Sequence, residues 1–156
     1  MNFQILGIKG LSRVMEVSCT IFQILGTILV LSLPWTLNYY LLYKQSLVED
    51  TIYYSMIILL FISGVCGFSI LHHAKKALHN INVKNPFTLD TANRIKYISY
   101  WCLPVAFIYL LAIFFIPSAF VLLVGLTFLF LAACIFIIAK LFYQAVNYKQ
   151  ENDLTI

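Results

Sequence analysis

The sequence has few charged residues. Only 10% of its 156 residues are Asp, Glu, Lys or Arg, whereas soluble domains contain roughly 25%. Hydrophobic residues make up 62% of the chain, and the mean hydropathy is +0.93. This composition excludes an ordinary water-soluble globule and predicts an integral membrane protein.

Recognisable catalytic motifs are also missing. The sequence contains no glycine-rich phosphate loop, no HExxH or GxSxG motif, and no serine with a base at a recognisable spacing. No apolar run carries an acidic or basic residue at its middle, as an ion or proton relay would require. We therefore expect no enzyme, no cofactor and, from this chain alone, no transporter.

Long uncharged runs occupy residues 17–43, 51–74 and 97–139. About 20 helical residues span a bilayer core of roughly 30 Å, so the first two runs each fit one crossing and the third fits two. Pro117 lies near the middle of the third run and predicts a turn there, because proline lacks the backbone donor that a helix needs. The sequence thus predicts one all-α domain, a bundle of four transmembrane helices.

The predicted spans are residues 14–37, 52–71, 98–116 and 119–142, and a helical connector occupies residues 72–97. All Lys and Arg residues except Lys44 fall on the side of the connector and the two termini. By the positive-inside rule, both termini and the connector are expected in the cytoplasm. The net charge of +4 then reflects membrane topology, and direct nucleic-acid binding is not expected.

The connector contains the pattern of a turn followed by a helix start. Pro86 disfavours a helical residue before it, Thr88 can cap a helix beginning at Leu89, and Asp90 would lie near the positive end of that helix. A helix start accounts for these residues without any function. Because the distinctive polar motifs share this side, they are also candidates for docking a cytoplasmic partner: Pro86, Phe87, Thr88, Asp90, Arg94, Glu151, Asn152 and Asp153.

A second candidate feature is a patch of small residues in the second span. Ser63, Gly64 and Gly67 would let a neighbouring helix approach closely. The patch predicts helix packing, either within the chain or in a homo-oligomer.

The other reactive side chains each allow a functional interpretation and a simpler structural one. Each predicted span contains one cysteine, and together the four could hold a metal: Cys19, Cys66, Cys102 and Cys134. A buried cysteine, however, commonly serves as a small apolar residue. His72, His73 and His79 could bind a metal or sense pH, although a solvated helix face is the simpler interpretation. Glu16 follows Arg13 by three residues, so an ion pair between them is expected. No metal site is predicted.

Residues 85–90 (NPFTLD), continuing to Arg94 and Ile95, resemble the signature of the domain of unknown function 2975 family, small four-span proteins of the bacterial cytoplasmic membrane. The chain end, residues 151–156 (ENDLTI), is similar to the acidic Leu-Thr-Ile tail of that family. Thr91 departs from the pattern, which often has Asn there. Members are frequently encoded beside a small Cro-type helix-turn-helix repressor, so the resemblance implies a membrane partner of such a regulator.

Three functions follow as hypotheses. The leading one is a membrane-bound regulatory or signalling partner of a cytoplasmic helix-turn-helix regulator. The alternatives are an immunity or self-protection protein against membrane-active peptides, and an accessory subunit of a transporter. The expected partners are the lipid bilayer, the regulator and a second copy of the chain.

Overall fold

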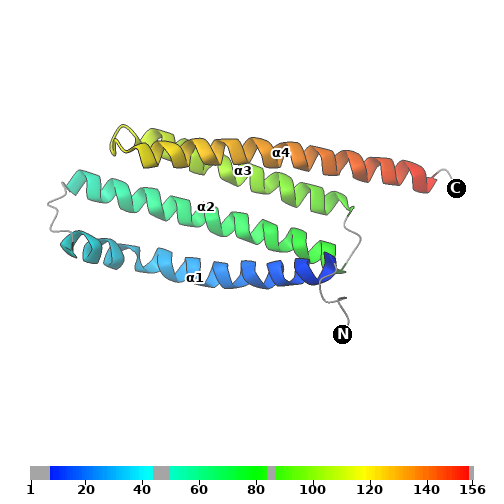
Figure 1. Cartoon of the computed structure of the whole chain (residues 1–156), viewed down its shortest axis with the longest axis horizontal. Helices are drawn as coiled ribbons and strands as arrows, with labels where there is room; N and C mark the ends of the chain where they lie inside the picture. The colour runs from blue at the N-terminus through cyan, green and yellow to red at the C-terminus, as the bar shows by residue number, and fades with distance from the viewer. Residues whose placement is uncertain (1–7, 44–49, 84–86, 155–156) are drawn as a thin grey trace.

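Four long helices make up nearly all of the described chain (Figure 1). The computed structural model describes residues 8–43, 50–83 and 87–154. The helices are α1 (Ile8–Tyr43), α2 (Asp50–Val83), α3 (Leu89–Ala112) and α4 (Ala119–Leu154). These three stretches of chain contain no β-strand. The all-α prediction is confirmed.

The helices are longer than the predicted spans. Each is long and apolar enough to cross a membrane, so the chain is a multi-pass membrane protein and the predicted four-helix bundle is confirmed. The 36 residues of α1 and of α4 extend about 54 Å, against a bilayer core of roughly 30 Å. A helix continues as long as its backbone hydrogen bonds are formed, whether or not it has left the bilayer. The helices α1, α2 and α4 therefore extend beyond the predicted spans, which are residues 14–37, 52–71 and 119–142.

Helices adjacent in the sequence pack against each other, α1 on α2, α2 on α3 and α3 on α4. Large apolar side chains point outward, as at Leu31 and Phe114, which are 77% and 81% exposed. Lipid tails are as apolar as these side chains, so close packing of small residues holds such helices together. The buried positions follow this rule and include Cys19, Cys66, Ala77, Ala92, Cys102, Ala106, Ala132 and Ala139.

The turn between α3 and α4 contains Pro117, as predicted, but α3 ends earlier than the predicted residue 116. The amides of Phe115 and Ile116 both donate to the carbonyl of Ala112, at 3.1 and 2.8 Å, so the last turn tightens before the proline. Proline disfavours a helical conformation in the residue before it, so α3 does not continue to the predicted end at residue 116. At this end of the molecule α2, α3 and α4 meet in a cluster formed by Leu59, Ala112 and Val121.

The small-residue patch of α2 lies partly against α1. A Cβ atom at Gly64 would collide with the side chain of Val30, whereas nothing lies within 4 Å of the corresponding position at Gly67. The Ser63 hydroxyl donates to the carbonyl of Leu59 in its own helix, at 2.6 Å. Gly64 therefore permits close helix packing within the chain, and the homo-oligomer stays a prediction.

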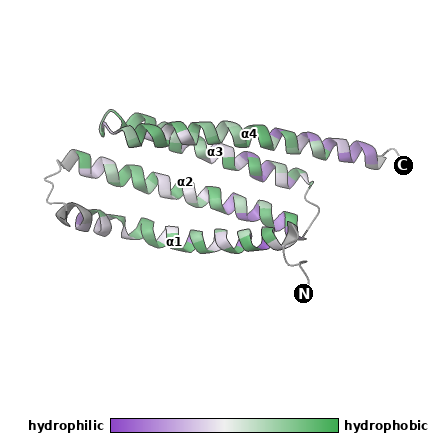
Figure 2. Cartoon of the chain, in the orientation of Figure 1, coloured by the Kyte–Doolittle hydropathy of each residue, from purple (hydrophilic) through white to green (hydrophobic). Residues whose placement is uncertain are grey.

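The two ends of the molecule differ in polarity. Hydrophilic residues gather where α2 and α4 finish and where α3 begins, and apolar residues predominate along the rest of these three helices (Figure 2). We call this part of the molecule the basic end, because it carries Arg13, Lys75, Lys76, Arg94, Lys96, Lys140 and Lys149. In the described residues of the opposite end there is no Lys or Arg.

The positive-inside rule predicts that the basic end faces the cytoplasm. Alkaline phosphatase folds only outside the cytoplasm, so a fusion after Ile156 should be inactive, while a fusion of the chain truncated after Pro117 should be active. Green fluorescent protein at the same two positions should give the opposite pattern. An active phosphatase after Ile156 would contradict this orientation.

Candidate functional site at the basic end

The start of α3 is built as the sequence predicts. Thr88 has an extended backbone (φ −125°, ψ 148°), and its hydroxyl accepts the amide of Thr91 at 3.3 Å, so it is the N-cap of α3. The two threonine hydroxyls lie 2.8 Å apart, and Thr91 is fully buried. Thr91, which departs from the pattern noted in the sequence, therefore has a polar partner of its own. Pro86 lies outside the described residues.

Asp90 and Arg94 hold this corner of the fold together. Arg94 Nε lies 3.3 Å from Asp90 Oδ1, one helical turn away, and Asn80 of α2 donates to Asp90 Oδ2 at 2.7 Å. Asn80 is buried, so its amide depends on this carboxylate. The pair that the sequence nominated for docking a partner thus joins the end of α2 to the start of α3.

The connector and the C-terminal part of α4 meet in one groove. The ring of Phe87 stacks on that of Phe142, with centroids 6.0 Å apart and planes at 26°. Beside this pair lies a groove of about 430 Å³ lined by Phe87, Ala145, Tyr148, Lys149 and Asn152. We call these five residues the docking surface. Two motifs that lie far apart in the sequence therefore share one surface.

The remaining C-terminal candidates lie on the last turns of α4. Glu151 and Asn152 are exposed on the last turns of α4. Asp153 belongs to the same helix, and its side chain lies outside the described part of the chain. Of the nominated residues, Phe87 and Asn152 line the docking surface, while Thr88, Asp90 and Arg94 form the corner beside it.

A polar contact between α1 and α2 is one that sequence analysis missed. Glu16 Oε1 lies 2.9 Å from His79 Nδ1, and its Oε2 accepts the side-chain amide of Asn82 at 2.8 Å. The predicted pair of Glu16 with Arg13 is wrong, because among the described residues Glu16 pairs with His79 of α2 and no ion pair joins it to Arg13. The sequence gives one signal for this contact. His79 and Asn82 are polar residues that follow His72 by seven and ten positions.

The other histidines and the cysteines do not converge. The ring of His73 stacks on Tyr97 of α3 at 5.2 Å, and His72 meets His73 edge to face at 5.7 Å. Residues 8–43, 50–83 and 87–154 hold no group of three or more His, Cys, Asp or Glu side chains placed to bind a metal. The four cysteines are free thiols, and those in the first three helices are buried: Cys19, Cys66 and Cys102.

Comparison with known proteins gives the chain a family but no activity. Residues 30–156 match the family described as "Protein of unknown function (DUF2975)". The comparisons with curated proteins and with solved structures found no match. The matched region runs from the middle of α1 to the chain end, and it includes the capped start of α3 and the docking surface. The chain belongs to the DUF2975 family.

Proposed function

We propose that this protein is a membrane-bound regulatory partner that holds a cytoplasmic helix-turn-helix regulator on its docking surface. The observation that carries the proposal is the meeting of the connector and the C-terminal segment in one groove. The proposal assigns no catalytic step to the chain, and it places the basic end in the cytoplasm of a bacterium.

The position of the docking surface supports a protein partner rather than lipid. Along α4, the distance from its first residue, Ala119, to Tyr148 is about 44 Å. This is about one and a half times the thickness of the bilayer core, roughly 30 Å. It is nevertheless 68% exposed, and Phe87 is 46% exposed. Aromatic side chains exposed beside a groove outside the membrane are typical anchors of a protein interface.

The nature of the partner rests on the family resemblance. Genes of this family frequently lie beside a gene for a small helix-turn-helix repressor, which supports such a regulator as the occupant. The experiment therefore identifies the partner itself.

The test compares two exposed tyrosines at opposite ends of the molecule. The tagged protein is purified from its native cells after mild crosslinking, and the partners are identified by mass spectrometry. Truncating a central aromatic contact costs about 2 kcal/mol, so Tyr148→Ser should lower recovery of the regulator by about thirtyfold under non-saturating conditions. The matched control is Tyr39→Ser, because Tyr39 is 74% exposed on α1 at the opposite end.

Equal recovery of the regulator with wild type and Tyr148→Ser, at equal membrane levels, would contradict the proposal. Recovery of a polytopic or ATP-binding protein in place of the regulator would instead assign the accessory role. An absence of either partner, together with sensitivity of a deletion strain to membrane-active peptides, would assign the protective role.

A further inference from the structure

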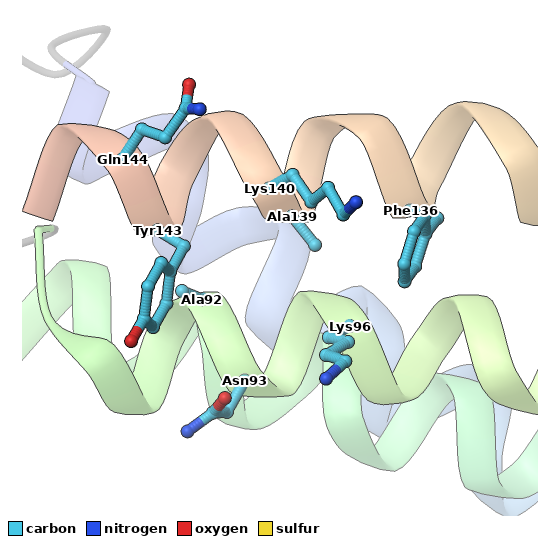
Figure 3. Close-up of a pocket in the computed structure, with 8 residues that line it drawn as sticks. All are labelled: Ala92, Asn93, Lys96, Phe136, Ala139, Lys140, Tyr143 and Gln144. Atoms are coloured by element: carbon cyan, nitrogen blue, oxygen red, sulfur yellow. The ribbon is translucent and has the colours of Figure 1, made fainter.

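A second groove at the basic end lies between α3 and α4, and it carries positive charge (Figure 3). Its volume is about 410 Å³. Lys96 and Asn93 of α3 line it, together with Lys140 and Tyr143 of α4. In the part of the chain that the structure describes, no acidic residue lines this groove and no carboxylate pairs with either lysine.

The groove exists because small residues bring the two helices together. Ala92 and Ala139 line the groove and are only 2% and 4% exposed. Since alanine fills little space, the larger side chains around these positions become the walls of a hollow. Tyr143 reaches from α4 toward Ala92 on α3 in the close-up (Figure 3).

Aromatic rings hold both ammonium groups in place. Lys96 Nζ lies 5.5 Å from the ring centroid of Tyr100, and Lys140 Nζ lies 5.1 Å from that of Phe136. The two rings also contact each other across the helix pair, with centroids 6.4 Å apart. Each ammonium group therefore lies over one ring of an aromatic pair that joins α3 to α4.

The depth of the lysines corresponds to the surface of a membrane. Lys140 follows Ala119, the first residue of α4, by about 32 Å along the helix, which matches a bilayer core of roughly 30 Å. Lys96 lines the same groove and lies at the same level. A bilayer with one face at the turn that contains Pro117 would place both ammonium groups close to the phosphates of its other face.

An exposed apolar stripe continues from the groove toward the opposite end. On α3, Tyr100, Leu103 and Phe107 follow Lys96 at helical spacing and are 44%, 44% and 64% exposed. On α4, Leu129 and Leu126 lie on the face of Lys140 and are 45% and 51% exposed. The whole surface thus combines two positive charges with apolar contacts below them.

We propose that the groove between α3 and α4 is a binding site for the headgroup of an anionic phospholipid. The phosphate would accept hydrogen bonds from Lys96 and Lys140, and the acyl chains would lie along the apolar stripe. A soluble phosphate could use the same two lysines, but it would leave the stripe unused, so a lipid is the better fit. Basic pockets between membrane helices are a recognised place for such headgroups.

The test uses the purified full chain in a neutral detergent. Short-chain phosphatidylglycerol is titrated, bound lipid is counted by native mass spectrometry, and phosphatidylcholine of the same chain length is the uncharged reference. Each hydrogen bond from these two lysines to the phosphate strengthens binding by a factor of about five, so the double variant Lys96→Ala/Lys140→Ala should bind phosphatidylglycerol about thirtyfold more weakly. The variant Lys96→Arg/Lys140→Arg keeps the charge and should retain binding, which separates loss of the site from loss of the fold.

The matched control is Lys75→Ala/Lys76→Ala on α2, which removes equal charge from the same end of the molecule. This control should bind phosphatidylglycerol as the wild type does. An equal loss in the control, or unchanged binding by Lys96→Ala/Lys140→Ala, would overturn the proposal. Displacement of the lipid by inorganic phosphate at the same concentration would overturn the lipid assignment in favour of a soluble anion. The experiment contains no regulator, so its result is independent of the docking surface.

Discussion

Gly64→Ala is expected to lower the free energy of unfolding by about 1–3 kcal/mol, the usual effect of overpacking a close contact. The added Cβ would collide with the Val30 side chain on α1. Valine has one strongly preferred rotamer in a helix, so Val30 cannot rotate away without strain. The helices themselves must then move apart, which removes the contacts of the α1–α2 pair around that point.

Gly67→Ala is the matched control for this change. It lies one turn along the same helix, where an added Cβ meets nothing within 4 Å. Alanine favours a helix over glycine by up to about 1 kcal/mol, so this variant should be neutral or stabilised. Unfolding in mixed detergent micelles measures both, and Gly64→Ala combined with Val30→Ala should recover the loss. Equal stability of Gly64→Ala and Gly67→Ala would contradict the close approach of α1 and α2.

Glu16→Ala is expected to destabilise the basic end of the α1–α2 pair by about 1–3 kcal/mol. The change removes the partner of His79 and of the Asn82 amide, and the Glu16 side chain is only 20% exposed. Within the described residues the Asn82 Oδ1 atom is buried without a hydrogen-bond partner, and the amide nitrogen would lose the carboxylate that accepts from it. A polar group buried without a partner costs more than the bond itself contributes.

Arg13→Ala distinguishes this contact from the one that the sequence predicts. Arg13 is an exposed residue of α1, three positions before Glu16. Its removal should change the free energy of unfolding by no more than about 0.5 kcal/mol. A double-mutant cycle between Glu16→Ala and Asn82→Ala should give a coupling energy of about 1 kcal/mol. Coupling of Glu16 to Arg13 instead of to Asn82 would contradict the observed geometry.

The fold could be predicted from the sequence wherever the physical cause is local. Uncharged runs of the right length predict four membrane helices, Pro117 predicts the turn, and Thr88 predicts the start of α3. Each of these depends on a few neighbouring residues or on composition over one span. The end of α3 at Ala112 departs from the prediction because the last turn tightens before the proline, over several residues.

The candidate sites could be predicted only in part, because they join distant segments. Spacing along one helix suggested Arg13 as the partner of Glu16, but the actual partners come from α2, more than 60 residues away. The connector and the chain end were each nominated, yet nothing in the sequence placed Phe87 beside Asn152. The groove between α3 and α4 depends on the buried alanines Ala92 and Ala139, which carry no signal of a site in the sequence.

In the proposed function, the connector and the C-terminal segment form one surface for a regulator. A photoreactive phenylalanine analogue in place of Tyr148 tests it most directly, because crosslinking in native cells reports contact at that position. We expect a crosslink to a small helix-turn-helix protein there, and none when the analogue replaces Tyr39 at the opposite end. A regulator that is present in the cells but crosslinks at neither position, or equally at both, would contradict the claim.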